Sequence, residues 1–208
     1  MGLTITPIEA SLGAVVTGVR LETLDDPTWA TLEAAFLEYA VLVFPGQHLD
    51  PAAQAVFAER FGEIEPLTPN PELKTAPLTN MRHGGKLADP EEEPSLVLRG
   101  NEEWHTDSSY MPLAARASVL SAHVVPPSGG QTEWADMRAA YDALDSGTRE
   151  RIADLSAYHS YYRSQASIGH RAQPGSGYGF HEEGSPLRPL VKPHPVTGRR
   201  ALYIGRHA

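Results

Sequence analysis

Short apolar stretches of different period follow one another along the first forty residues of the chain. Residues 3–8 and 14–19 have the length and composition of short strands, with glycines beside them. The dipeptide Asp26-Pro27 is a helix-start signal, and the large apolar side chains after it share one helical face: Trp29, Leu32, Phe36 and Tyr39. We therefore predict two strands followed by a helix.

A second strand–helix pair is predicted next. Residues 41–44 form a continuous apolar run bounded by Pro45-Gly46, as a buried strand does. Asp50-Pro51 then predicts the start of another helix, which ends at Gly62. We interpret the aromatic faces of both helices as core rather than as a ligand-binding surface.

After residue 62 the apolar pattern becomes less regular, and short predicted elements alternate with loops. Residues 63–101 are rich in proline and predict a long irregular loop. Residues 118–125 alternate like a strand, and residues 126–130 predict a turn. Asp136 is placed to cap a helix over residues 137–144, and a further helix is expected over residues 148–155. Later strands are expected at residues 157–162, 189–191 and 201–205, so the pattern predicts an α+β fold that is mainly β in its later part.

Composition narrows the class of protein. The 208 residues include 17 basic and 26 acidic side chains, giving a formal charge of −9. No Lys/Arg-rich stretch occurs, which argues against nucleic acid and anionic membranes as partners. The chain has no cysteine, so disulfides and thiolate metal sites are excluded. Without a secretory signal or a long apolar run, we expect a cytoplasmic location.

The candidate chemistry lies at His105 and Asp107. Two residues apart on an extended segment, these side chains point to the same face. An imidazole and a carboxylate that converge in this way can supply two ligands of the 2-His-1-carboxylate triad that holds non-haem Fe(II). The alternative is a surface hydrogen bond or a half-buried histidine, because one His-x-Asp triplet is expected by chance in a chain of this composition.

Longer motifs around this pair resemble the TauD/TfdA family of Fe(II)- and 2-oxoglutarate-dependent dioxygenases. The segments that carry the resemblance are Trp-His-Thr-Asp-Ser-Ser-Tyr at 104–110, Pro-Pro-Ser-Gly-Gly-Gln-Thr-Glu at 126–133 and Pro-His-Pro-Val-Thr-Gly-Arg at 193–199. The resemblance begins near Ile5, covers nearly the whole chain and is nearest to the phenoxyalkanoate branch. It implies one dioxygenase domain over residues 1–208, with a double-stranded β-helix core (a jelly roll, cupin-like) and N-terminal and inserted helices. It also implies Fe(II), 2-oxoglutarate and O2 as cofactor and co-substrates.

The resemblance assigns roles to individual residues. His105 and Asp107 correspond to metal ligands, and Thr132 corresponds to a hydroxyl that binds the distal carboxylate of 2-oxoglutarate. Without the motif, Thr132 would be read as an ordinary β-branched strand residue. The family's second metal-binding His and its 2-oxoglutarate Arg have no matching positions in this chain, so we expect a domain that is incomplete at its C-terminus. His207 falls at a structural position of the family pattern.

The substrate is expected to be a small organic anion. By the same resemblance, Asn101 and Ser108 lie beside the substrate, and Glu65 replaces a His that grips the sulfonate in taurine dioxygenases. Because a carboxylate repels that anion, taurine is disfavoured and ether cleavage of a phenoxyalkanoate is favoured. An alkylsulfonate or alkylsulfate dioxygenase, a binding-only jelly roll and a zinc hydrolase remain as alternatives, and a homo-oligomer is left open.

Overall fold

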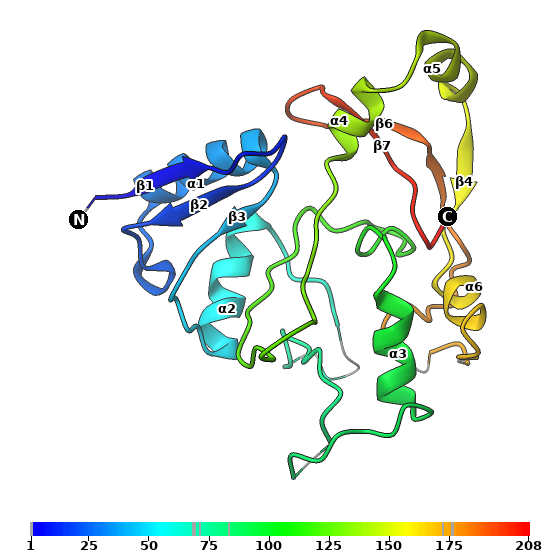
Figure 1. Cartoon of the computed structure of the whole chain (residues 1–208), viewed down its shortest axis with the longest axis horizontal. Helices are drawn as coiled ribbons and strands as arrows, with labels where there is room; N and C mark the ends of the chain where they lie inside the picture. Colours follow the sequence, from blue (N-terminus) through cyan, green and yellow to red (C-terminus); the bar gives the residue numbers. More distant parts are fainter. Residues whose placement is uncertain (1, 68–69, 71, 83, 172, 176) are drawn as a thin grey trace. The chain divides into compact units, whose positions relative to one another are not determined.

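A computed structural model of the chain describes residues 2–67, 70, 72–82, 84–171, 173–175 and 177–208 (Figure 1). The chain divides into two compact units, each assembled from separate stretches of sequence. The first unit contains the chain up to Arg60 together with Val119–Glu150 and Val191–Leu202. The second contains Phe61–Ser118, Arg151–Leu190 and Tyr203–Ala208.

The first unit begins with a three-stranded sheet (Figure 1). Strand β1 (Thr4–Pro7) pairs antiparallel with β2 (Ala14–Thr17), and β2 pairs parallel with β3 (Leu42–Val43). The connection from β2 to β3 contains the 3-10 turn η1 (Leu21–Thr23) and helix α1 (Asp26–Tyr39), since a parallel pair needs a long crossover. The predicted strand–helix–strand order is therefore present.

Both N-terminal helices begin at capping aspartates. Asp25 accepts a hydrogen bond from the Thr28 amide at the start of α1, one residue earlier than the cap that the sequence predicts. Asp50 accepts a hydrogen bond from the Ala53 amide at the start of α2 (Pro51–Ala58). The 3-10 turn η2 (Glu59–Phe61) follows α2 directly. The inward faces of these helices are apolar, and their buried side chains with those of β2 form the core of the unit: Ala14, Val16, Leu32, Ala35, Ala55 and Phe57.

The later stretches of the first unit contribute a helix and a two-stranded sheet. Helix α4 (Met137–Asp142) lies against β7 (Arg200–Leu202), which pairs antiparallel with β6 (Val191–Pro193) (Figure 1). Asp136 caps α4 through the amides of Arg138 and Ala139, as predicted. The next helix, α5, spans Ser146–Ile152.

The second unit has an aromatic core. Helix α3 (Glu93–Asn101) contacts α6 (Tyr161–Ala166), and β4 (Ser156–Tyr158) pairs antiparallel with β5 (Leu187–Pro189). The buried rings that join these elements to the loops are Tyr110, Tyr161 and Phe180. The rings of Tyr110 and Tyr161 are stacked, with centroids 4.5 Å apart.

Several sequence predictions differ from this structure. The run at residues 41–44 was predicted as a buried strand, but β3 lies at an edge of its sheet and Val43 is 45% exposed, because no further strand of the described chain covers it there. Residues 118–125 form no strand, because no described segment pairs with them and a strand needs a ladder partner. Helix α3 occupies the end of the predicted loop, and a proline in its first turn was the signal that could have revealed it. Tyr161 and Tyr162 begin helix α6 instead of continuing a strand, because Ser160 caps that helix. None of the described helices is long and apolar enough to cross a membrane.

Candidate metal centre

His105 and Asp107 converge at a turn that follows helix α3. The Nε2 atom of His105 lies 3.1 Å from Oδ1 of Asp107. The side chain of Asp107 is 58% exposed and that of His105 is 23% exposed, so solvent and solutes reach the pair. Adjacent ligand atoms around an octahedral ion with bonds of about 2.1 Å are separated by about 3 Å. The two donor atoms therefore fit neighbouring positions on one divalent ion.

The far side of each ligand is held by a hydrogen bond. Nδ1 of His105 donates to the carbonyl oxygen of Glu103 at 2.7 Å, which leaves Nε2 as the atom that faces Asp107. The Ser118 hydroxyl donates to Oδ2 of Asp107 at 2.8 Å, which leaves Oδ1 facing His105. Neither of these two hydrogen bonds is signalled by a sequence motif, and Ser118 was not among the residues predicted from the sequence.

The pKa values of His105 and Asp107 shift in opposite directions, and both shifts favour an ionised carboxylate beside a positive charge. The hydrogen bond with Asp107 raises the pKa of His105 although burial opposes it. The hydrogen bond from His105 lowers the pKa of Asp107 against burial, with a further contribution from Ser118. A positive charge at Nε2 and a carboxylate at Oδ1 thus stabilise each other, and a divalent cation can take the place of the shared proton.

His207 lies next to the pair but is held by other groups. Its ring centroid is 5.3 Å from that of His105, and Nδ1 is 2.8 Å from the Ser164 hydroxyl. Burial lowers the pKa of His207 to about 4, and the nearby charges of His105 and Arg206 act in the same direction. The ring packs edge-on against Tyr110 in the aromatic core. Within the described part of the chain, no group of three His, Asp or Glu side chains is arranged to hold a metal ion.

Ser108, a predicted substrate contact, has a buried side chain. It is 3% exposed, and its hydroxyl lies 2.7 Å from Oε2 of Glu65 and 2.6 Å from the hydroxyl of Tyr178. Tyr178 also donates to Oε2 of Glu65 at 2.9 Å. The structure thus brings together Glu65 and Ser108, which both carry a predicted role, and adds Tyr178, which lies in no sequence motif.

Asn101, the other predicted substrate contact, is the last residue of α3 and faces helix α6. Its Oδ1 atom accepts long hydrogen bonds from the Tyr161 hydroxyl, at 3.4 Å, and from Nε2 of Gln165, at 3.5 Å. A Cβ atom on the preceding Gly100 would lie 2.4 Å from the Gln165 side chain, so glycine permits this close approach of the two helices.

Thr132, the predicted 2-oxoglutarate contact, belongs to the first unit. It is exposed in the irregular stretch that precedes α4. His105, Asp107, Ser108 and Asn101 all belong to the second unit.

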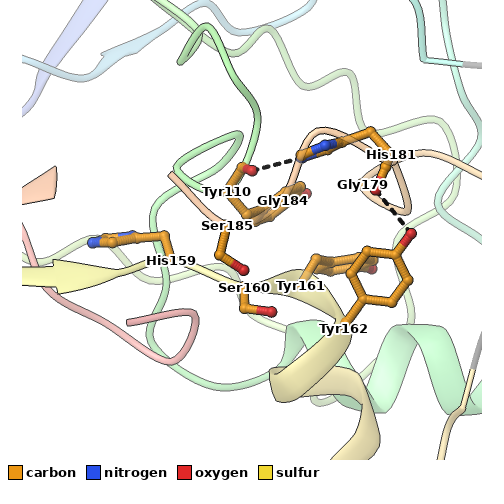
Figure 2. A pocket seen from close by; sticks show the side chains of 9 residues that line it. All are labelled: Tyr110, His159, Ser160, Tyr161, Tyr162, Gly179, His181, Gly184 and Ser185. Carbon is orange, nitrogen blue, oxygen red and sulfur yellow. Dashed lines mark hydrogen bonds between the residues drawn. The ribbon is translucent and has the colours of Figure 1, made fainter. Parts of the chain in front are cut away.

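A small pocket borders the other side of the same turn (Figure 2). The main-chain oxygen of Tyr110 accepts a hydrogen bond from Nε2 of His181 at 2.9 Å. The Tyr162 hydroxyl donates to the carbonyl of His181 at 2.9 Å. These two hydrogen bonds connect Tyr110 and helix α6 to the loop before β5, and the pocket lining includes neither His105 nor Asp107.

A family profile described as "Taurine catabolism dioxygenase TauD, TfdA family" matches residues 4–208. Over 98% of its length the chain is 50% identical to the (S)-phenoxypropionate/alpha-ketoglutarate-dioxygenase of Sphingobium herbicidovorans, covering 71% of that protein. It is 35% identical over its whole length to the alpha-ketoglutarate-dependent 2,4-dichlorophenoxyacetate dioxygenase of Cupriavidus pinatubonensis, covering 75% of that enzyme.

The structure is also similar to solved structures. The crystal structure of AAD-2 in complex with Mn(II) and N-oxalylglycine superimposes with a TM-score of 0.88 at 36% identity. That match covers 100% of this chain and 73% of the other. A 2,4-D dioxygenase homologue from Burkholderia xenovorans gives a TM-score of 0.80 at 30% identity, covering 100% and 71% of the two chains.

Proposed function

The chain belongs to the TauD/TfdA family of dioxygenases, and from that premise we propose that it cleaves the ether bond of phenoxyalkanoic acids. It is an Fe(II)- and 2-oxoglutarate-dependent dioxygenase, like its homologues. The observation that carries the substrate proposal is the 50% identity, over nearly the whole chain, to two enzymes that act on (S)-phenoxypropionate.

The proposed domain comprises residues 1–208 with a double-stranded β-helix core. The match to AAD-2 over the full length of the chain supports this proposal. The antiparallel pairs β4–β5 and β6–β7 are the strands that we assign to that core.

The proposed site uses each side chain for a separate task. His105 Nε2 and Asp107 Oδ1 supply two of the three protein ligands of the metal triad, and the hydroxyl of Thr132 orients the distal carboxylate of 2-oxoglutarate. Asn101 is assigned to the substrate at the end of α3. When bound, Fe(II) with 2-oxoglutarate and O2 supplies the oxidising power that hydroxylates an aliphatic carbon, with release of succinate and CO2.

The remaining chemistry belongs to the substrate. Hydroxylation of the carbon between the ether oxygen and the carboxylate gives a hemiketal. That intermediate breaks its carbon–oxygen ether bond, and the hydroxyl proton passes to the departing phenolate. The products are a phenol and a 2-oxo acid. The protein contributes orientation of this carbon toward the metal pair.

The test is incubation with Fe(II), 2-oxoglutarate and (S)-2-phenoxypropionate under air. We expect phenol and succinate in equal amounts, since each turnover decarboxylates one 2-oxoglutarate. His105→Ala and Asp107→Ala each remove a proposed metal ligand and should abolish both products. Taurine and an alkyl sulfate ester serve as competing substrates, the second because an alpha-ketoglutarate-dependent sulfate ester dioxygenase of Pseudomonas putida is 31% identical. Faster succinate release with either competitor would contradict the substrate proposal, and full activity of either variant would contradict the site.

A further inference from the structure

A compact group of three side-chain oxygens, two hydroxyls and one carboxyl oxygen, lies next to the proposed metal ligands. Ser108, Tyr178 and Glu65 contact one another through three side-chain oxygens at 2.6, 2.7 and 2.9 Å. We call these three residues the Glu65 cluster. They come from three loops: Glu65 follows η2, Ser108 follows Asp107, and Tyr178 lies between α6 and β5. The cluster therefore ties two distant loops to the residue next to a metal ligand.

The backbone of Ser108 explains why such a tie is needed. Its φ of +54° lies in the left-handed region, which a residue other than glycine, asparagine or aspartate seldom occupies. A strained conformation of this kind persists where the surrounding contacts impose it. The next turn depends on it, because the Met111 amide donates to the Ser108 carbonyl at 3.0 Å.

Burial strengthens the cluster. Oε1 of Glu65 is also shielded from solvent, and no hydrogen bond reaches it from the described residues. The two hydroxyls on Oε2 therefore provide the stabilisation that this carboxyl group receives. Burial raises the pKa of Tyr178 well above its usual value, so its hydroxyl keeps the proton that it donates. If either hydroxyl is removed, the Oε2 atom of Glu65 keeps only one of its two hydrogen-bond donors.

We propose that Glu65 and Tyr178 are positioning residues, which hold Ser108 in its left-handed conformation and thereby aim the adjacent Asp107 carboxylate at the metal. This inference rests on the proposed function, because it takes Asp107 as a ligand. It gives Glu65 a role different from repelling an anionic substrate. It also explains how an exposed carboxylate keeps one orientation: its neighbour is anchored in the core while Ser118 holds its outer oxygen.

The experiment measures Mn(II) binding to the metal-free protein by the EPR signal of free Mn(II), with thermal unfolding of the same samples. Tyr178→Phe removes one hydroxyl and keeps the ring that packs against Tyr110. Glu65→Gln removes the carboxylate with little change of shape. Tyr162→Phe is the matched control, because its hydroxyl is also hydrogen-bonded in the second unit but contacts the His181 carbonyl instead of Ser108.

We expect Tyr178→Phe and Glu65→Gln each to weaken Mn(II) binding about tenfold, the lower end for residues that support metal ligands. The double variant should be little weaker than either single variant, because both act through Ser108. Tyr162→Phe should bind Mn(II) as the unaltered protein does. Equal Mn(II) affinity in all variants, with or without a loss of thermal stability, would overturn the inference. Absence of Mn(II) binding by the unaltered protein would instead overturn the proposed metal site and the inference with it.

Discussion

Two hydrogen bonds, one from His105 to its near neighbour Glu103 and one from Ser118 to Asp107, determine how the side chains of the candidate centre are oriented. His105 is fixed through a main-chain carbonyl two residues away, and Asp107 is fixed by the hydroxyl of Ser118. These contacts select the nitrogen and the oxygen that face each other at 3.1 Å. The motif thus contains the two proposed ligands, while residues outside it orient their side chains.

The hydroxyl of Ser118 gives the first prediction. Ser118→Ala removes the donor to Asp107 and should weaken Mn(II) binding by up to about tenfold, since Ser118 is exposed and water partly replaces it. Ser118→Thr keeps a hydroxyl, so its dissociation constant for Mn(II) should stay within about twofold of that of the unaltered protein. This change is well below the roughly tenfold loss that follows when a metal ligand loses its supporting hydrogen bond. Titration with Mn(II) followed by EPR measures both. If the two variants lose the same affinity, the hydroxyl is not the cause.

The second prediction concerns the co-substrate. Thr132→Ala should raise the dissociation constant of 2-oxoglutarate by about tenfold, because a hydrogen bond to a carboxylate is worth roughly 1.5–3 kcal/mol. The same change should leave Mn(II) affinity nearly unaltered, since Thr132 is not a proposed ligand. Calorimetric titration of the Mn(II)-loaded protein with 2-oxoglutarate measures the first value. Parallel losses for metal and co-substrate would refute the assigned role.

At the scale of secondary structure, one charged pair fixes helix α4 within the first unit. The side chains of Asp136 and Arg138 are 4% and 13% exposed, with Nε of Arg138 donating to Oδ1 of Asp136 at 2.9 Å. The guanidinium also donates to the carbonyl of Glu38 at 2.9 Å, near the end of α1. A single aspartate therefore caps one helix and orients the cation that connects it to another.

A pH-dependent prediction follows for Asp136. Burial raises its pKa, but hydrogen bonds from the Arg138 side chain and from the amides of Arg138 and Ala139 outweigh burial and hold the pKa below its usual 3.8. A lowered carboxyl pKa stabilises the folded state above pH 3.8, and this contribution is lost as the pH falls through the folded-state pKa.

Asp136→Asn keeps a side-chain oxygen that can cap α4 but removes the negative charge that pairs with Arg138, so it should lower the free energy of unfolding by roughly 2 kcal/mol at pH 7. The difference between variant and unaltered protein should shrink as the pH falls below 3.8, where the unfolded chain binds the proton first, and should be lost as the pH passes through the lower folded-state pKa of Asp136. Urea unfolding at pH 7 and pH 3 measures it. A difference that stays constant between the two pH values would exclude the ionised carboxylate as its source.

Elements with local start signals could be predicted, and those that depend on distant partners could not. The aspartate–proline pairs predicted the starts of α1 and α2 to within one residue, since capping acts over a few residues. The alternation at residues 118–125 predicted a strand that is absent, because the sequence does not show which segment would pair with it. Ser108 and Glu65 were each noticed, but their contact joins residues 43 positions apart.

At the scale of the whole molecule, metal binding and folding are linked. A ligand that binds the folded protein and not the unfolded chain raises the free energy of unfolding by an amount set by its concentration. Mn(II) at a hundred times its dissociation constant should add about 2.7 kcal/mol. Denaturant unfolding with and without Mn(II) measures this increase. Asp107→Ala should remove most of it, and an unchanged increase in that variant would locate the bound ion elsewhere.

The sequence by itself predicted the family and the enzyme class and singled out His105 and Asp107 as the candidate metal-binding pair, because these predictions depend on residue types at fixed short spacings. Comparison confirmed the family and the dioxygenase class. Only the tertiary structure decided which atoms of the pair face each other and that Ser108 is buried in the Glu65 cluster. Orientation and burial arise from contacts between segments that folding brings together, and such contacts leave no periodic signal in the chain.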